Sequence, residues 1–149
     1  MKIKQFRMKP PYFVALLVML SWLIDRMFPR YSFNVYPGAG MALIIFALLI
    51  IVYSASLFRK NKTPIVPGTT PEFFITEGAY KLSRNPIYFS MVIFLIGTSL
   101  LFQNSLTLIS PIAFFFIINK YYVLYEENLM EQTFGKKYLS YKKQVRRWI

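Results

Sequence analysis

The sequence predicts an all-α integral membrane protein with four transmembrane helices, the last two forming a tight helical hairpin, followed by a helical C-terminal segment in the cytosol. Of the 149 residues, 56% are hydrophobic and 16% are charged, a composition more apolar than that of an ordinary soluble domain. Long uncharged runs recur at lengths that suit a bilayer, and Lys and Arg gather between and after them. We therefore expect a single membrane domain over residues 1–149.

Two spans are expected in the first half of the chain, at about 10–28 and 39–58. Asp25 and Arg26 interrupt the first apolar run near its end, and a basic stretch that begins at Arg59 ends the second. The basic start of the chain resembles the opening of a signal peptide, but no small-residue cleavage pattern follows the apolar run. We therefore expect the first span to be retained.

The second half contains an unbroken uncharged run over 85–119, about twice the length that one helix needs. Polar residues at 103–105 lie near its middle, which predicts a hairpin of two spans at about 86–102 and 106–125. The second helix should continue beyond the run into a charged, tyrosine-rich segment and end at Gly135.

The distribution of Lys and Arg predicts the orientation. With the amino terminus inside, only Arg26 and Arg30 lie in far-side turns, and the other basic residues face the cytosol. Both termini are then cytosolic, as in a multi-pass protein of a prokaryotic inner membrane. The loop 59–84 and the tail 120–149 share that face and can meet.

The net charge of +12 is explained by this same retention of basic residues on the cytosolic side, so we expect no nucleic-acid partner. The chain contains no Cys and no His, which excludes thiolate nucleophiles, histidine bases and the usual zinc sites. We expect no metal. The basic tail also suits attraction to anionic lipid head groups, above all at Lys142 and Lys143.

A first polar cluster surrounds the start of the third span. Asn85 is a favoured N-cap residue, and Pro86 suits the first helical position, so part of this cluster is explained by helix initiation alone. Helix initiation does not require Arg84 and Tyr88, one turn apart, to accompany Tyr80 at the membrane surface. Gly97 and Ser90, deeper in the same span, are expected to be helix-packing positions.

A second cluster contains two adjacent acids. Neighbours on a helix point about 100° apart, so Glu126 and Glu127 cannot share one role. Glu127 falls on a face with Lys120 and Glu131, which predicts a solvated, partly ion-paired stripe. Glu126 falls with Tyr122 on a less charged face, and it is the carboxylate expected to point into a site. The alternative, that both acids are ordinary cytosolic polar residues, stays open.

The two clusters, in this order and separated by a hydrophobic hairpin, resemble the membrane methyltransferase family that contains isoprenylcysteine carboxyl methyltransferases and phospholipid methyltransferases. The resemblance extends from about Pro64 to Trp148. It implies a pocket for S-adenosylmethionine at the cytosolic membrane face, formed by segments 63–88 and 120–149. It also implies catalytic roles for Arg84 and Glu126, and places Arg146 and Arg147 at the pocket edge. By similarity, the cofactor-binding residues are Glu72, Phe73, Phe74, Ile75, Tyr80, Asn85, Pro86, Ile87, Tyr88 and Glu126.

The resemblance agrees with the expected chemistry. A sulfonium cation is stabilised by aromatic faces and by a carboxylate, while methyl transfer is an in-line displacement whose rate depends mostly on alignment. The acceptor is expected to be a membrane lipid or a lipidated molecule of the isoprenyl-cysteine kind. Two positions depart from the family: Asn85 replaces the histidine of eukaryotic members, and Tyr122 replaces the acceptor-binding arginine of the isoprenylcysteine enzymes. The second departure leaves an amine or another lipid head group open as acceptor.

Two other functions also fit the pattern. Membrane sterol reductases resemble the same C-terminal architecture and use NADPH, although they are usually much longer. A non-catalytic membrane adaptor whose basic tail binds anionic lipid is the third possibility. An adaptor would not need the Tyr80–Tyr88 cluster and Glu126 together.

Overall fold

The structure is a computed structural model that describes residues 8–28, 35–63 and 73–149, and in these residues the chain is helical without β-strands. Short turns of other helix types link the α-helices: the 3₁₀ helices η1 (Gly78–Lys81) and η2 (Ser105–Leu108) and the π-helical turn η3 (Asn119–Val123). The α-helices are α1 (Pro10–Met27), α2 (Pro37–Lys60), α3 (Pro86–Phe102), α4 (Ile109–Ile118), α5 (Leu124–Phe134) and α6 (Lys136–Gln144).

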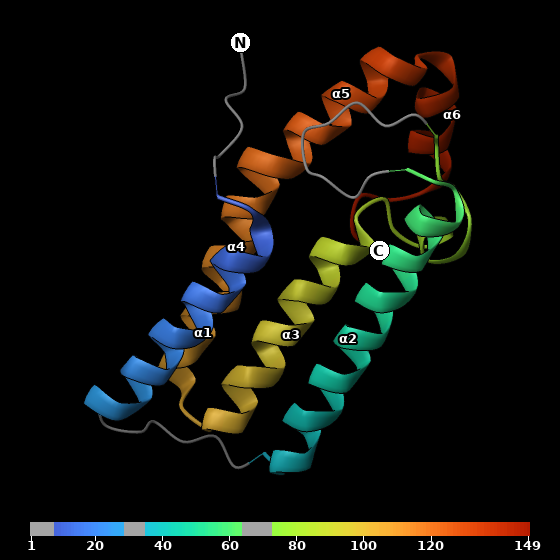
Figure 1. Cartoon of the computed structure of the whole chain (residues 1–149). Coiled ribbons are helices and arrows are strands. Elements are labelled where there is room, and N and C mark those ends of the chain that lie inside the picture. The colour runs from blue at the N-terminus through green and yellow to red at the C-terminus, as the bar shows by residue number, and fades with distance from the viewer. Residues whose placement is uncertain (1–7, 29–34, 64–72) are drawn as a thin grey trace.

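Four helices, α1 to α4, lie side by side, and α4 runs on through η3 into α5, which rises beyond the bundle (Figure 1). Gly135, with a φ of 50°, ends α5 as predicted, and α6 then folds back. We call this part of the molecule the α5–α6 end. Among the described residues, Pro10–Met27, Pro37–Lys60 and the continuous helix Ser105–Phe134 are long and apolar enough to cross a membrane.

The third expected span corresponds to α3, which has the predicted bounds but, at 17 residues, is a shorter apolar helix. Four spans therefore remain an expectation, whereas a multi-pass membrane protein agrees with the three longer helices. The first two spans lie within a few residues of the predicted positions. The fourth is longer than expected, because its helix continues without a break from the turn at Ser105 to Phe134.

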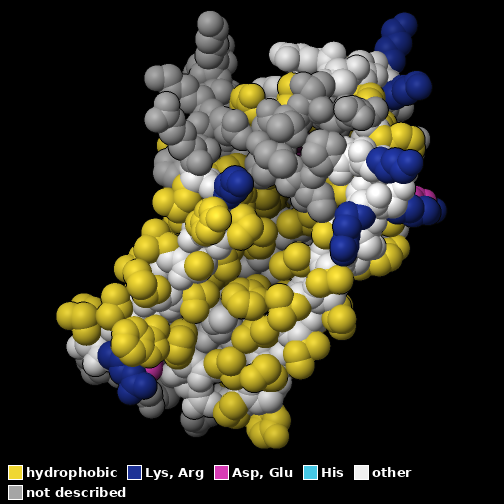
Figure 2. Space-filling model, viewed as in Figure 1, with side chains coloured by type: hydrophobic (Ala, Val, Ile, Leu, Met, Phe, Trp, Pro, Cys, Tyr) yellow, Lys and Arg dark blue, Asp and Glu magenta, His cyan; other side chains and the backbone are white. Residues whose placement is uncertain are grey.

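The surface of the bundle is apolar around the helices and basic at one end. In Figure 2, hydrophobic side chains cover the shaft formed by the helices, and most visible Lys and Arg atoms lie towards the α5–α6 end. Large side chains on α1 and α2, such as Trp22, Leu49 and Tyr53, are about half exposed or more. Such a surface suits contact with lipid tails.

The closest helix contact joins α3 to α2 rather than to α4. A Cβ added at Gly97 would lie 2.8 Å from the Gly40 carbonyl oxygen, and one at Gly40 would lie equally close to the Gly97 carbonyl oxygen. The two glycines therefore let the backbones approach, which confirms Gly97 as a packing position. As the predicted hairpin requires, α4 follows α3 across a short turn and packs on it, but the most extensive packing of α3 is with α2.

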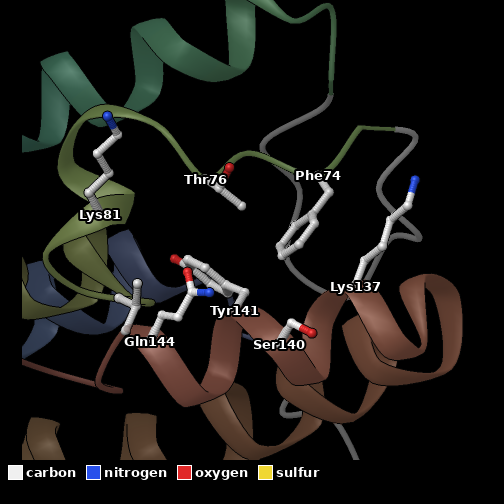
Figure 3. A pocket seen from close by; sticks show the side chains of 8 residues that line it. Phe74, Thr76, Lys81, Lys137, Ser140, Tyr141 and Gln144 are labelled. Carbon is white, nitrogen blue, oxygen red and sulfur yellow. The ribbon is translucent and has the colours of Figure 1, made fainter.

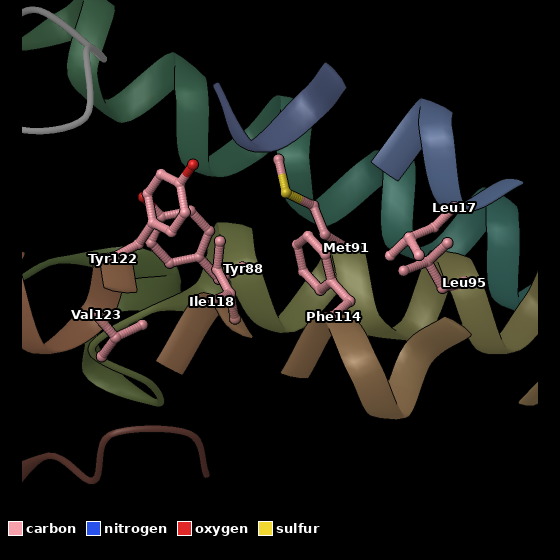
Figure 4. Close-up of a cluster of buried hydrophobic side chains, with 8 residues drawn as sticks. All are labelled: Leu17, Tyr88, Met91, Leu95, Phe114, Ile118, Tyr122 and Val123. Atoms are coloured by element: carbon pink, nitrogen blue, oxygen red, sulfur yellow. The ribbon is translucent and has the colours of Figure 1, made fainter. Parts of the chain in front are cut away.

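The core lies between α1, α3 and the helix that begins with α4. Figure 4 shows its buried side chains: Leu17, Tyr88, Met91, Leu95, Phe114, Ile118, Tyr122 and Val123. A buried hydrogen bond of 2.6 Å between the hydroxyls of Ser21 and Ser110 joins α1 to α4 within it. Ser90, the other expected packing position, is fully buried, and its hydroxyl donates to the Pro86 carbonyl in its own helix.

A buried acid holds the α5–α6 end together. Glu127 is only 5% exposed, and two arginines from distant segments face its carboxylate. Arg147 donates from Nε and Nη2 at 3.0 and 2.7 Å, a bidentate pair. The Arg84 Nη1 lies 2.9 Å from Oε1, an ion pair without directed hydrogen-bond geometry. We call Arg84, Glu127 and Arg147 the Glu127 clamp.

The expectation that Glu127 lies on a solvated stripe was therefore wrong. Its face of α5 is covered by the segment before α3 and by the C-terminal tail, neither of which is near it in sequence. Lys142 also differs from expectation, since its ammonium pairs with Glu131 at 2.9 Å instead of being left for lipid head groups.

The C-terminal tail is fixed to the segment before α3 by backbone contacts. The Arg84 N–H donates to the Arg146 carbonyl at 3.0 Å, and the Ser83 hydroxyl and the Asn85 amide both donate to the Arg147 carbonyl. Trp148 then packs on Phe115 of α4 with ring centroids 4.9 Å apart. The prediction that the two segments meet is confirmed for the described residues.

The glycine contact gives a first prediction. Gly97→Val places a side chain against the α2 backbone, so the free energy of unfolding should fall by about 1–3 kcal/mol, the usual cost of overpacking. Denaturant unfolding in detergent micelles measures this. Ala42→Val, which places the same valine side chain at an exposed position of α2, serves as the control and should change stability little. Equal stability of the two variants would show that the glycines do not set the helix distance.

The clamp gives a second prediction. Glu127→Gln leaves the buried Arg84 guanidinium, whose side chain is 9% exposed, without its counter-charge. The free energy of unfolding should then fall by about 3 kcal/mol or more. The matched control is Glu131→Gln, which breaks the pair with Lys142. Both of these side chains are about a third exposed, so the change should cost at most about 1 kcal/mol. A Glu127→Gln protein as stable as the control would contradict the clamp.

Candidate functional site

Two of the side chains expected at a site are in direct contact. Tyr88, in the first turn of α3, donates a hydrogen bond of 2.6 Å from its hydroxyl to Oε1 of Glu126, near the start of α5. The two residues lie 38 positions apart. Because a hydrogen bond to a carboxylate is short and strong, the contact fixes both side chains in one orientation.

Tyr80 lies within electrostatic range of this pair. It belongs to η1, its ring packs edge-on against Phe58 at 5.8 Å, and its carbonyl accepts a 2.6 Å hydrogen bond from the Tyr141 hydroxyl. Burial, and then the charge of the Glu126 carboxylate, raise the pKa of the Tyr80 phenol above its usual value. Tyr88 and Glu126 are thus in direct contact, and Tyr80 lies within range of the Glu126 charge. The Tyr88 side chain is buried, whereas Tyr80 and Glu126 are partly exposed.

The π-helical turn η3 was not anticipated from the sequence. A π turn inserts a residue into a helix and shifts the faces of everything that follows, and such turns are frequent at functional sites. Tyr122, within η3, is buried against the start of α1, where its hydroxyl donates to the Met8 carbonyl, and its ring lies 6.4 Å from that of Tyr88. In Figure 4, Tyr122 and Tyr88 lie together at one end of the core. No glycine or proline marks η3, so no local signal predicted it.

Some of the residues at the start of α3 have structural roles. Asn85 occupies the N-cap position and Pro86 the first helical position, as predicted, but the Asn85 side chain makes no cap hydrogen bond. Its amide donates instead to the Arg147 carbonyl at 3.1 Å. Ile87 is half-buried against the core. Asn85 is thus a link to the tail, a role that sequence reasoning missed.

The residues before η1 form the outer wall of the α5–α6 end. Phe74 stacks on Phe134 with centroids 5.1 Å apart and contacts Tyr138 and Tyr141. Ile75 is buried, and Phe73 is half exposed. Glu72 lies outside the described residues.

Arg84 lies with Glu127 rather than with the Tyr88–Glu126 pair. Its guanidinium also approaches the Tyr138 hydroxyl: burial and the Glu127 charge raise the pKa of Tyr138 to about 12, against the opposing effect of a hydrogen bond with Arg84. Of the two tail arginines expected at a pocket edge, Arg146 is exposed and Arg147 is held by Glu127, which raises the pKa of its guanidinium. The two adjacent acids thus serve different partners, and Glu126 is the one that faces the tyrosines.

In the described part of the chain, no group of three or more Asp, Glu, His or Cys side chains is arranged to hold a metal ion. The Tyr88–Glu126 pair presents a carboxylate and an aromatic ring, groups that suit an organic cation.

Comparisons with known proteins agree with the resemblance. A protein of Haemophilus influenzae described only as uncharacterized is 36% identical over 63 residues, which cover 42% of this chain and 100% of that protein. Protein-S-isoprenylcysteine O-methyltransferase B of Arabidopsis thaliana is 34% identical over 74 residues, 48% of this chain and 36% of that enzyme. This chain therefore matches only about a third of the plant enzyme's length.

A solved structure of a eukaryotic intramembrane Ras methyltransferase, an isoprenylcysteine carboxyl methyltransferase, superposes with a TM-score of 0.71 over 97% of this chain and 53% of that one, at 19% identity. The two proteins share a fold. The family described as phospholipid methyltransferase matches residues 36–137, which is more than half of the chain. The match includes the cluster at the start of α3 and the two adjacent acids, but not the C-terminal tail. On the strength of that match, this chain belongs to the phospholipid methyltransferase family.

Proposed function

We propose that this protein transfers a methyl group from S-adenosylmethionine to a lipid-like acceptor at the cytosolic face of the membrane. The observation that carries the proposal is the hydrogen bond between Tyr88 and Glu126, with Tyr80 within range of the Glu126 charge. Family membership supports methyl transfer as the reaction.

The residues present fit the cofactor. S-adenosylmethionine supplies a methyl group on a positively charged sulfur, and the Glu126 carboxylate and the rings of Tyr80 and Tyr88 are groups that attract such a cation. The Tyr88 hydroxyl holds the carboxylate in place from one side. Of the other residues inferred by similarity, Phe73, Phe74 and Ile75 line the outer wall, and Asn85, Pro86 and Ile87 form the start of α3.

In the proposed reaction the carbon–sulfur bond breaks as a lone pair of the acceptor forms a bond to the methyl carbon. The chain's contribution is alignment, because an in-line displacement needs little covalent help. Glu126 would offset the positive charge of the bound cofactor, and the tyrosine rings would lie against it. For an amine acceptor, the same carboxylate is placed to accept the proton that the methylated nitrogen releases.

Arg84 takes a changed role in this proposal. The sequence indicated a catalytic residue, but its guanidinium is engaged by Glu127, so we propose that it supports the start of α3 rather than the reacting groups. The Glu127 clamp also occupies Arg147. An acceptor without a carboxylate, such as an amine or a neutral head group, therefore suits this site better than the anionic isoprenylcysteine named for the plant relative.

We further propose that the α5–α6 end faces the cytosol, with both termini on that side and the chain in a prokaryotic inner membrane. The support is the gathering of Lys and Arg at this end, which agrees with the bias of basic residues to the cytosolic side. A water-borne cofactor and a bilayer-borne acceptor would meet there.

Calorimetric titration of the purified protein in micelles tests the cofactor. We expect S-adenosylmethionine and S-adenosylhomocysteine to bind and NADPH to give no heat. Binding of NADPH alone would favour a reductase, and no heat from any of the three would favour an adaptor.

Glu126→Gln tests the role of the carboxylate. Because only S-adenosylmethionine carries the sulfonium charge, its dissociation constant should rise about tenfold, and that of the neutral S-adenosylhomocysteine should rise less. Glu131→Gln, on the same helix but paired with Lys142, is the control and should leave both constants unchanged. Equal losses for the two ligands would mean that Glu126 does not face the sulfur.

The acceptor is identified by incubating membranes that contain the protein with methyl-labelled S-adenosylmethionine and then extracting total lipid. We expect label in the lipid fraction, dependent on Glu126. Label only in water-soluble products would refute a lipid-like acceptor.

A further inference from the structure

A cavity of about 550 Å³ opens at the α5–α6 end, between the segment around η1 and α6. Its volume is in the range of small-molecule sites. Figure 3 shows Lys81 on the η1 side and Lys137 on α6, with Phe74 and Tyr141 between them. Thr76 before η1 and Ser140 and Gln144 of α6 complete the polar lining. Neither Tyr88 nor Glu126 lines this cavity.

Two lysines give the lining of the cavity a positive charge. Neither of its two lysines has an ion-pair partner among the described residues. The carboxylates closest to them in sequence are occupied elsewhere: Glu77 pairs with Lys60 at 3.3 Å, and Glu131 pairs with Lys142 at 2.9 Å. Among the residues that the structure describes, no acidic side chain lines the cavity. An anionic ligand would therefore meet two ammonium groups that no described carboxylate neutralises.

The walls of the cavity are preformed. The Tyr141 hydroxyl is held by the Tyr80 carbonyl at 2.6 Å, and Phe74 is stacked on Phe134. The hydroxyl of Ser140 and the amide of Gln144 make no hydrogen bond with other described residues, so both can donate to a ligand. Little ordering is needed when a ligand binds, which favours affinity.

The position of the cavity points to a lipid. Lys81 ends η1, and Gly78 at the start of η1 lies against Tyr53 and Leu57 of α2, close to the end of that apolar helix. Leu82, beside Lys81, is 75% exposed. A large exposed apolar side chain next to a lysine, at the end of a membrane helix, is typical of the head-group layer. There the apolar side chain can enter the lipid while the lysine ammonium stays among the phosphates.

We propose that this cavity binds the phosphate of an anionic phospholipid head group, at a site separate from the Tyr88–Glu126 pair. Lys81 and Lys137 supply the charge from opposite walls, and Ser140 and Gln144 supply neutral donors to the remaining phosphate oxygens. Such a lipid would hold α6 and the segment before α3 together at the membrane surface.

The test is calorimetric titration of the full chain in zwitterionic micelles with short-chain phosphatidylglycerol, short-chain phosphatidylcholine and inorganic phosphate. We expect phosphatidylglycerol to bind, and the double variant Lys81→Gln/Lys137→Gln to weaken that binding about tenfold or more. The matched control is Lys136→Gln/Lys143→Gln, which removes the same charge from exposed positions of α6 outside the cavity and should change the affinity less than threefold, on the order expected for loss of long-range attraction alone.

Three results would overturn the proposal. Equal losses in the two double variants would mean that overall charge, not this cavity, attracts the lipid. If inorganic phosphate bound as tightly as phosphatidylglycerol, the ligand of the cavity would be free phosphate and not a lipid head group. Loss of phosphatidylglycerol binding in the presence of saturating S-adenosylhomocysteine would assign the cavity to the cofactor. Melting temperatures of both double variants, expected to match the parent because all four lysines are exposed, exclude a folding defect.

Discussion

The buried Glu127 carboxylate is the interaction on which the α5–α6 end depends. It binds Arg84 from the segment before α3 and Arg147 from the C-terminal tail, so three parts of the chain far apart in sequence are joined at one point. Removing two arginines and an acid from water is costly, and the pairing repays that cost only while all three stay together. The tail's hydrogen bonds to Ser83 and Asn85 follow from the same arrangement.

The clamp also explains why two adjacent acids do different things. Because neighbours on a helix point about 100° apart, fixing Glu127 towards the arginines turns Glu126 towards Tyr88. Glu127 pairs with the two arginines, and Glu126 faces the tyrosine ring of Tyr88. A carboxylate that faces aromatic side chains at the edge of a bilayer can attract a cationic cofactor without being neutralised by the protein's own arginines.

Much of this architecture follows from the sequence. Hydropathy predicted α3 with its observed bounds, Asn85 and Pro86 marked its start, and helical periodicity separated Glu126 from Glu127 and placed it with the tyrosines. The burial of Glu127 could not be predicted, because its partners are side chains brought up by tertiary folding. The π turn η3 has no local signal either, and the closeness of α2 and α3 depends on glycines in two helices that only the fold aligns.

The central claim is that the Tyr88–Glu126 pair lies at the methyl-transfer centre. A determined structure of the protein with bound S-adenosylmethionine tests it most directly, since the position of the sulfur relative to both side chains can be read from it. Our account predicts that the sulfonium lies within about 6 Å of the Tyr80 or Tyr88 ring and on the same side as the Glu126 carboxylate. A cofactor bound elsewhere, with Tyr88 still hydrogen-bonded to Glu126 and neither side chain near the sulfur, would contradict it.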